Sequence, residues 1–285
     1  MATIDILGVR HSYCLTAPTG SPHVLVFLHG WLLSRHYWQP LIDLLASDYQ
    51  CLCYDLRGFG ESEPSRGFEA PANLSYSPAA YAEDLAVLLE KLDISSAWLV
   101  GHSLGGAIAL WAADLSPQQV KGVVCVNSGG GIYLKEEFER FRSVGQQLVR
   151  WRPLWLSYLP LMDLMFARMS VVNAIARFWG RQRLIDFAAA HPQAALGALL
   201  DSTTEAEVHL LPQIVARLKQ PVYFITGDRD PIMEPKYVLH LASFHWLFAG
   251  CGENVMQIPD CGHLAMVEYP QVVATYLQRI LSEDN

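Results

Sequence analysis

Gly101-His102-Ser103-Leu104-Gly105 lies between two apolar runs, Ala97-Trp98-Leu99-Val100 and a longer one from Gly106 to Ala113. The first run is typical of a buried strand and the second of a helix. A strand that reverses at once into a helix around a Gly-flanked serine predicts a strained turn that exposes the serine oxygen above a sheet. The glycines are needed because the backbone segments of such a turn lie too close together for side chains. Ser103 is therefore a candidate nucleophile, at a helix start whose free N–H groups favour developing negative charge.

The segments on either side of this turn alternate between strand-like and helix-like patterns. Strand-like runs lie at 24–28, 51–54, 97–100, 122–126, 222–225 and 255–258, and helix-like segments lie at 37–46, 81–92 and 271–281. This alternation predicts a doubly wound α/β fold, with a mostly parallel sheet covered by helices on both faces.

One stretch of the chain departs from the alternation. Residues 132–212 have helical periodicity and few strand-like runs. We therefore predict a core domain of residues 1–131 and 213–285, and a helical cap over 132–212 inserted between the sixth and seventh strands of the core. The cap should lie over the carboxyl ends of the strands, where such sheets bind ligands.

Two aspartates and a histidine in the last quarter of the chain could activate Ser103. A serine hydroxyl is a poor nucleophile at neutral pH and needs a histidine base that is held by a carboxylate. His263 comes soon after the strand-like run at 255–258, and both Asp228 and Asp230 come soon after the run at 222–225. Asp228 also suits a turn or a cap. The chain order Ser, Asp, His is one in which this chemistry occurs.

In this order the motifs resemble the α/β-hydrolase fold superfamily, and in particular its lid-bearing serine esterases and C–C hydrolases. The matching motifs are His29-Gly30, Asp55-x-Arg57-Gly58-x-Gly60-x-Ser62, Gly101-His102-Ser103-Leu104-Gly105-Gly106, Gly227-x-x-Asp230 and Gly262-His263. They span most of the chain and leave only the predicted cap unmatched. The resemblance is specific for the fold and much less specific for the substrate.

The resemblance implies roles for individual residues. It implies a catalytic triad of Ser103, Asp230 and His263, with Asp230 rather than Asp228 as the acid. It also implies that the backbone N–H groups of Trp31 and Leu104 form an oxyanion hole. His29 and Arg57 are expected to brace the loops around the site. Haloalkane dehalogenases and epoxide hydrolases of the superfamily have aspartate at the elbow, so Ser103 excludes their alkyl-enzyme route.

The predicted cap is rich in aromatic residues and methionine. Together with the core it provides the candidate pocket residues Trp31, His102, Trp155, Met162, Met165 and Phe166. Side chains of these types form adaptable apolar pockets, so we expect a substrate with a hydrophobic acyl or alcohol portion, either a small-molecule ester or a lipid. The alternative is that they only pack the cap helices together and onto the core.

Charge is distributed unevenly along the chain. The formal net charge of −8 argues against nucleic acid as a partner, because phosphate binding needs a basic surface. Between Arg140 and Arg183, however, there are eight arginines and a single acid, Asp163. These arginines could pair with acids of the core. They could instead place the cap against an anionic membrane surface, since Arg with Trp and Leu is typical of interfacial helices.

Cysteine usage and the first residues bear on location and cofactors. The six cysteines form no C-x-x-C pair and no metal-ligand spacing, which is typical of a reducing compartment. The first ten residues lack the long apolar core of a secretory signal. We therefore expect a cytoplasmic protein. If the arginines of the cap contact an anionic membrane, the protein would be peripheral to that membrane. No cofactor fingerprint or metal site is seen, so neither is expected.

These observations favour a serine hydrolase that cleaves a carboxylic ester of a hydrophobic small molecule or lipid through an acyl-enzyme. Fold and triad do not separate this reaction from C–C bond hydrolysis, a lyase step or acyl transfer, which relatives perform with the same residues. A third possibility is a ligand-binding protein that retains the fold without catalysis. All three triad residues are present, and a protein that only binds has no need of them.

Overall fold

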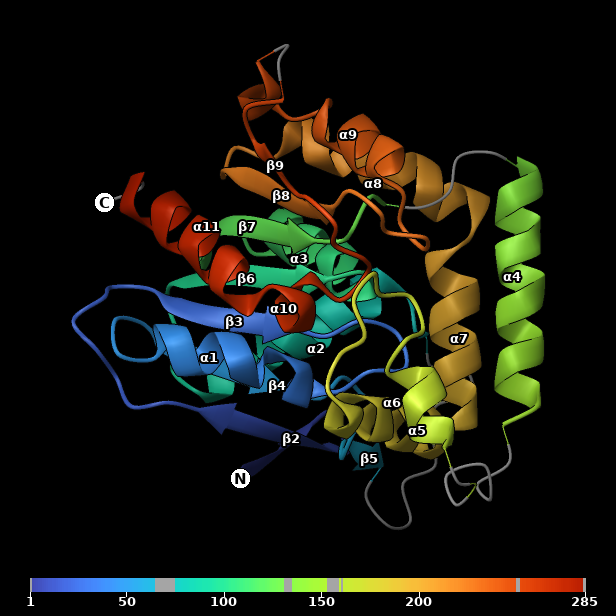
Figure 1. Ribbon diagram of the computed structural model, residues 1–285. Helices are drawn as coiled ribbons and strands as arrows, with labels where there is room; N and C mark the ends of the chain where they lie inside the picture. The colour runs from blue at the N-terminus through green and yellow to red at the C-terminus, as the bar shows by residue number, and fades with distance from the viewer. Residues whose placement is uncertain are drawn as a thin grey trace.

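The computed structural model describes residues 2–64, 75–130, 135–152, 159, 161–249 and 252–283. In these residues one nine-stranded sheet has the order β1-β2-β4-β3-β6-β7-β8-β9, with β5 paired to β2 (Figure 1). The strands are β1 (Ala2–Ile6), β2 (Val9–Leu15), β3 (Val24–Leu28), β4 (Gln50–Tyr54), β5 (Glu63–Pro64), β6 (Ala97–His102), β7 (Val120–Val126), β8 (Val222–Gly227) and β9 (Val255–Ile258).

The sheet is mostly parallel, as predicted. Neighbouring strands from β4 to β9 run parallel, whereas β2 pairs antiparallel with β1, β4 and β5. The two N-terminal strands were not expected, because their pattern is mixed in polarity: β1 is largely exposed and β2 carries buried His11 and Ser12. The strand β3 and residues 97–100 of β6 are continuous apolar runs, as expected for strands that helices cover on both faces of the sheet.

Helices cover the two faces of the sheet. One face packs against α1 (Gln39–Leu45) and α11 (Pro270–Glu283), and the other against α2 (Pro78–Lys91), α3 (Leu104–Leu115), α8 (Glu205–Arg217) and α9 (Pro235–Ala242). A short helix, α10 (Ala265–Glu268), precedes α11. The predicted doubly wound α/β class is therefore confirmed.

Between β7 and β8 the chain contains helices and no described strand. These are α4 (Lys135–Arg150), α5 (Met162–Phe166), α6 (Arg177–Ala189), α7 (Pro192–Ser202) and α8. Figure 1 shows α4 and α7 side by side, on the side of the sheet to which the arrowhead of β7 points. The boundary proposed at residue 212 falls inside α8, which packs on α3, so the division into core and cap stays a prediction. None of the described helices is long and apolar enough to cross a membrane.

Candidate active site

Ser103 occupies a strained turn between β6 and α3. Its backbone has φ 52° and ψ −117°, an uncommon conformation for a residue with a side chain, and α3 begins at the next residue. The turn requires its glycines: a Cβ on Gly101 would lie 2.2 Å from the carbonyl oxygen of Gly105, and a Cβ on Gly105 would lie 2.3 Å from that of Leu28. The hydroxyl of Ser128, beyond the end of β7, donates to the Ser103 carbonyl oxygen at 2.8 Å. The Ser103 side chain is thus held at the carboxyl ends of the strands.

His263 and Asp230 are brought together from the loops after β9 and β8. The distance between His263 Nδ1 and Asp230 Oδ2 is 2.7 Å. Oδ1 of Asp230 accepts the N–H groups of Ile232 and Met233 at 2.8 and 2.9 Å. Asp228 lies elsewhere, and its carboxylate accepts the N–H of Cys261 at 3.3 Å. Asp230 is therefore the aspartate that orients His263.

Asn127 is a further partner of Asp230 that the sequence reasoning missed. It is fully buried directly after β7, and its Nδ2 donates to Asp230 Oδ2 at 2.8 Å and to the Gly262 carbonyl at 3.1 Å. A polar residue that directly follows a buried strand was the signal that could have identified it. Burial by itself would raise the pKa of Asp230, but the charge and hydrogen bond of His263, with two backbone N–H groups, hold this pKa below its ordinary value.

His102 supports the backbone of His263. Its Nε2 lies 2.7 Å from the His263 carbonyl oxygen, and its ring is completely buried. Burial, followed by the nearby His263, lowers the pKa of His102 to about 3. The ring is therefore neutral at physiological pH, and Nε2–H is the donor because a carbonyl oxygen can only accept.

Two backbone N–H groups beside Ser103 are free to bind an anion. In the described part of the chain, neither the N–H of Trp31 nor that of Leu104 donates a hydrogen bond. Leu104 is the first residue of α3, and helix starts leave such donors unsatisfied. The Trp31 indole Nε1 reaches across to α7 and donates to the Ala195 carbonyl at 2.7 Å.

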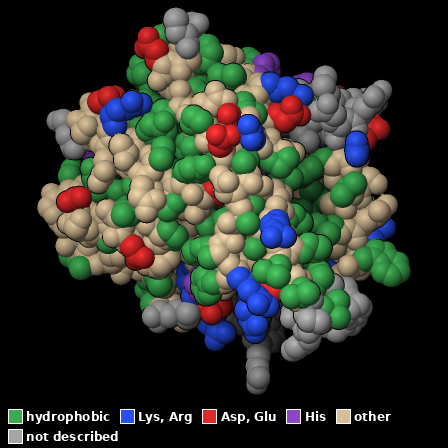
Figure 2. Space-filling view, viewed as in Figure 1, with side chains coloured by type: hydrophobic (Ala, Val, Ile, Leu, Met, Phe, Trp, Pro, Cys, Tyr) green, Lys and Arg blue, Asp and Glu red, His purple; other side chains and the backbone are tan. Residues whose placement is uncertain are grey.

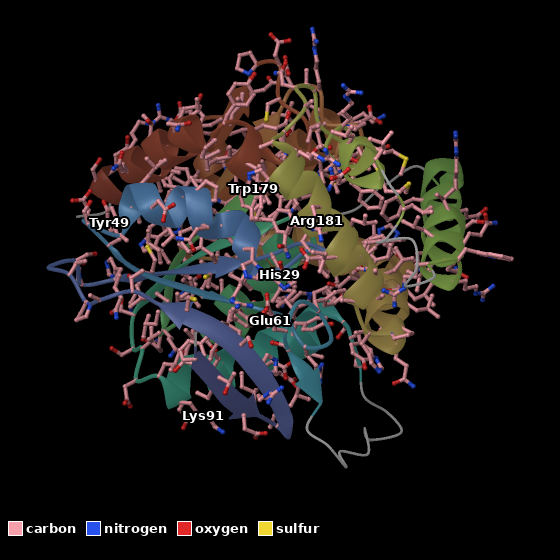
Figure 3. The ribbon with its side chains drawn as sticks, turned by 60° about the horizontal axis from the view of Figure 1, so that its bottom comes forward. His29, Tyr49, Glu61, Lys91, Trp179 and Arg181 are labelled. Atoms are coloured by element: carbon pink, nitrogen blue, oxygen red, sulfur yellow. The ribbon has the colours of Figure 1, made fainter. Side chains whose placement is uncertain are left out.

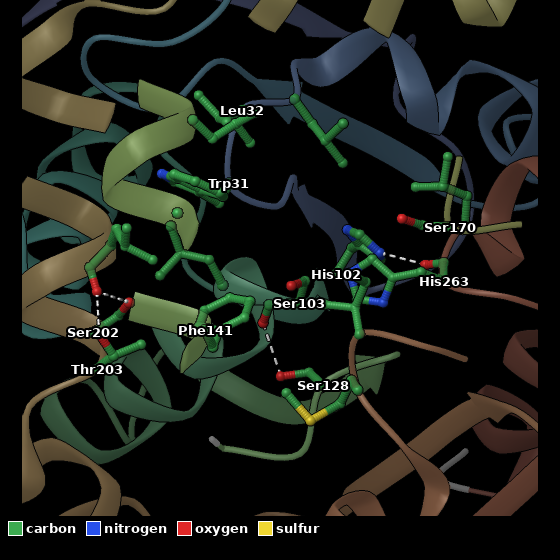
Figure 4. A pocket seen from close by; sticks show the side chains of 18 of the residues that line it. Trp31, Leu32, His102, Ser103, Ser128, Phe141, Ser170, Ser202, Thr203 and His263 are labelled. Carbon is green, nitrogen blue, oxygen red and sulfur yellow. Dashed lines mark hydrogen bonds between the residues drawn. The ribbon is translucent and has the colours of Figure 1, made fainter. Parts of the chain in front are cut away.

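A cavity of about 350 Å³ contains both Ser103 and His263 in its wall. Figure 4 shows Ser103 between His263 on one side and Trp31 and Phe141 on the other. Most of the lining is apolar and comes from the loop after β3 and from α4, α6 and α7. The inserted helices contribute the side chains Phe141, Val144, Leu148, Phe166, Arg183, Phe187, Leu199 and Ser202.

The predicted pocket residues divide into three groups. Trp31, His102 and Phe166 line the cavity. Met162 and Met165 do not, and this part of the prediction is wrong. Met162 packs partly buried against the main hydrophobic cluster, and Met165 is 51% exposed. Trp155 lies outside the described residues.

His29 and Arg57 connect loops around the site. The ring of His29, labelled in Figure 3, accepts the Leu56 N–H at Nε2 and lies 2.8 Å from the Gly30 carbonyl at Nδ1. Arg57 pairs with Asp84 at 3.4 Å and donates to the Ser75 carbonyl. Neither side chain lines the cavity, and both hold backbone segments together.

Several exposed arginines of the insert form no ion pair with a described acid of the core. Arg177 pairs with Asp163, and both lie within the insert. Among the described residues, no acid lies within ion-pair distance of Arg140, Arg150, Arg168 or Arg181, and all four are exposed. These four side chains are therefore available to an external partner. No group of three metal-ligand side chains converges anywhere in the described ranges.

Comparisons with known proteins agree with this architecture. The model of the alpha/beta hydrolase fold family matches residues 23–270. A 2-succinyl-6-hydroxy-2,4-cyclohexadiene-1-carboxylate synthase of Escherichia coli is 30% identical over 281 residues, covering 96% of this chain and 99% of the relative.

Solved structures agree as well. An esterase of Thermogutta terrifontis superposes with a TM-score of 0.76 at 21% identity, over 100% of this chain and 99% of the other. An enol-lactonase of Burkholderia xenovorans superposes with a TM-score of 0.75 at 17% identity, over 99% of this chain and 100% of the other. The family match covers most of the chain, and the chain belongs to the alpha/beta hydrolase fold family.

Proposed function

We propose that the protein is a serine hydrolase that cleaves a carboxylic ester of a hydrophobic small molecule or lipid. The observation that carries the proposal is the joint position of Ser103, of His263 paired to Asp230, and of two free N–H groups in the wall of one apolar cavity. A nucleophile, a base and an oxyanion site are the parts that acyl transfer requires.

The reaction proceeds in two halves. His263 takes the proton of the Ser103 hydroxyl as Oγ attacks the ester carbonyl, and the N–H groups of Trp31 and Leu104 bind the resulting oxyanion. The C–O bond to the alcohol then breaks, and His263 gives its proton to the leaving oxygen. Water, deprotonated by His263, attacks the acyl-enzyme and releases the acid and Ser103. Asp230 stays ionised and stabilises the charged imidazole in both halves.

Hydrolysis of aryl esters should depend on acyl chain length. The cavity lining is apolar, and each buried methylene contributes about 0.8 kcal/mol, so kcat/KM should rise roughly fourfold per methylene until the cavity is filled. Initial rates with a series from acetate to octanoate measure this. Ser103→Ala should lower turnover by about 10⁴-fold or more, and Ser282→Ala at the exposed end of α11 should not change it. A flat series, or turnover by Ser103→Ala close to that of the wild type, would contradict the proposal.

A second reaction class is supported by the synthase relative. That relative is named as the synthase of a cyclohexadiene carboxylate and not as an esterase. The same three side chains can serve C–C hydrolysis, a lyase step or acyl transfer. Negligible turnover of every aryl ester, while a fluorophosphonate still labels Ser103, would favour this class. Failure of Ser103 to react with the fluorophosphonate would favour a non-catalytic ligand-binding protein.

Contact with anionic lipid is a further part of the proposed function. At the start of α5, on α5 and on α6, the residues Leu161, Met165 and Phe178 are 63%, 51% and 64% exposed. Exposed Arg168 and Arg181 each follow one of them by three residues in the sequence. Figure 2 shows arginine side chains beside hydrophobic ones in this region, and Figure 3 labels Arg181 on α6. Apolar side chains that enter the headgroup region and arginines that meet anionic lipid are the two contributions that hold a protein on a membrane surface.

Vesicle binding tests this contact. The protein should co-sediment with vesicles containing phosphatidylserine at low salt and much less with pure phosphatidylcholine vesicles. Because each basic residue near such a surface contributes about 1 kcal/mol, the double variant Arg168→Glu/Arg181→Glu should bind at least tenfold more weakly. Arg229→Glu, a charge reversal outside the insert, is the control. No binding of the wild type to the anionic vesicles at low salt would refute the membrane contact.

A further inference from the structure

Among the described residues that line the cavity, Arg183 is the one arginine or lysine, and it is buried. Arg183 is 7% exposed and lies in the middle of α6. Phe166, Met169 and Phe187 also line the cavity. Burial lowers the pKa of Arg183, although a guanidinium remains protonated at physiological pH. Removing such a charge from water is unfavourable by several kcal/mol unless a partner compensates it.

Only part of the guanidinium is satisfied by the protein. Nη1 donates to the Phe166 carbonyl oxygen at 2.8 Å and also to that of Met169. In the described part of the chain, Nε and Nη2 have no acceptor, and no acid lies within ion-pair distance of Arg183. Neither atom is a fully buried polar atom without a partner, so both are accessible from open space. The free edge of the guanidinium, formed by Nε and Nη2, is the fork that matches a carboxylate.

The nearby acids are occupied elsewhere. Glu268 is the carboxylate whose charge acts on Arg183, but its oxygens accept the N–H groups of Val172, Gly262 and Leu264 at 2.9 to 3.3 Å. Asp186, three residues after Arg183, accepts from Ser34 at 2.9 Å. Burial raises the pKa of Asp186 to about 7, so this group is only partly charged at neutral pH. The cation thus lacks a dedicated counter-ion.

A short series of hydrogen bonds and backbone contacts also connects Arg183 to His263. Nη1 bonds Met169, and the next residue, Ser170, accepts the N–H of His263 through its carbonyl oxygen at 2.8 Å. A Cβ on Gly262 would lie 2.7 Å from Val171, so this segment lies directly against the loop that carries His263. A group bound at Arg183 and a group bound at Ser103 would share one cavity.

We propose that Arg183 binds a carboxylate of the substrate, so that the enzyme prefers esters whose apolar chain ends in a free carboxylate. The inference rests on the proposed serine hydrolase and names the substrate class of the same site. The carboxylate accepts from Nε and Nη2 while the apolar walls hold the connecting chain. The scissile carbonyl then lies at Ser103, and the carboxylate takes no part in bond making or breaking.

A matched pair of substrates tests this proposal. The aryl ester of hexanoic acid and the aryl mono-ester of adipic acid differ by a terminal carboxylate on acyl chains of the same length. The wild type should prefer the adipate mono-ester in kcat/KM by roughly 10- to 100-fold, the range of a hydrogen bond to a charged group. Arg183→Met should remove this preference, so that kcat/KM becomes similar for the two esters; any loss from the released Phe166 and Met169 carbonyls is common to both. Arg183→Lys should retain part of the preference, because it keeps the charge and loses the fork.

A control variant and a binding measurement separate recognition from a purely structural clamp. Arg140→Met removes an exposed arginine of the insert that does not line the cavity, and it should preserve the preference. If kcat/KM fell equally for both esters in Arg183→Met, so that their ratio stayed at the wild-type value, the proposal would be overturned. Calorimetry with the inactive Ser103→Ala protein should show binding of the adipate mono-ester that falls at least tenfold when Arg183→Met is added. Equal binding, or no binding, would also overturn it.

The same experiments keep the two proposals apart. A fluorophosphonate that labels Ser103, together with ester turnover that ignores the carboxylate, contradicts only the role of Arg183. Absence of labelling and of turnover contradicts the serine hydrolase, whereas binding of the mono-ester through Arg183 is still measured by calorimetry.

Discussion

His263→Ala should lower kcat for aryl esters roughly 10⁴- to 10⁶-fold, because in the proposed mechanism His263 is both the base that activates Ser103 and the acid that protonates the leaving alcohol. Ser103→Ala should have an effect of similar size. The double variant should be hardly slower than either single variant, since the two residues act as one unit. The residual rate comes from the cavity and the free N–H groups of Trp31 and Leu104.

Steady-state kinetics, corrected for any initial burst, on the wild type, the two single variants and the double variant measures the coupling between Ser103 and His263. His209→Ala is the matched control, because His209 lies on α8 with its side chain 70% exposed. Circular dichroism and the unfolding midpoint establish that the variants are folded. Additive losses in the double variant, or a loss of less than about 10²-fold in His263→Ala, would mean that His263 is not the base for Ser103.

Asp230→Asn should lower kcat by about 10⁴-fold while the fold is retained. The carboxylate accepts four hydrogen bonds, from Asn127, Ile232, Met233 and His263. An amide replaces one accepting oxygen by a donor and removes the negative charge. It therefore favours the wrong tautomer of His263 and no longer stabilises the charged ring.

Asp228→Asn provides the comparison for this prediction. Asp228 precedes Asp230 by two residues, and its one described side-chain hydrogen bond is with the Cys261 N–H, which an asparagine oxygen can also accept. Its kcat should stay within about threefold of the wild type. If Asp228→Asn were the slower variant, the assignment of the orienting acid would be reversed.

The fold and the central residues of the site could be predicted because they depend on local pattern. Ser103, Asp230 and His263 each follow a buried strand, and parallel strands bring their carboxyl ends to one edge of the sheet. The glycines around Ser103 indicate a turn in which backbone segments lie too close together for side chains. These signals need no knowledge of how distant segments pack.

The remainder of the site depends on tertiary packing. The composition of α5 does not show which of its five residues line the cavity. In the structure Phe166 lines it, whereas Met162 and Met165 do not. Arg183 was one of eight arginines in its segment, and only the packing of α6 shows it to be buried. Its neighbour Arg181 on the same helix is exposed.

The central claim is that Ser103 becomes covalently acylated, and rapid mixing with an aryl ester followed by intact mass measurement tests it most directly. A burst of the aryl alcohol close to one equivalent should accompany a mass gain equal to the acyl group, located on the peptide that contains Ser103. Both should be absent from Ser103→Ala. Steady turnover of the ester by the wild type without any acylated protein, or acylation that persists in Ser103→Ala, would contradict the account.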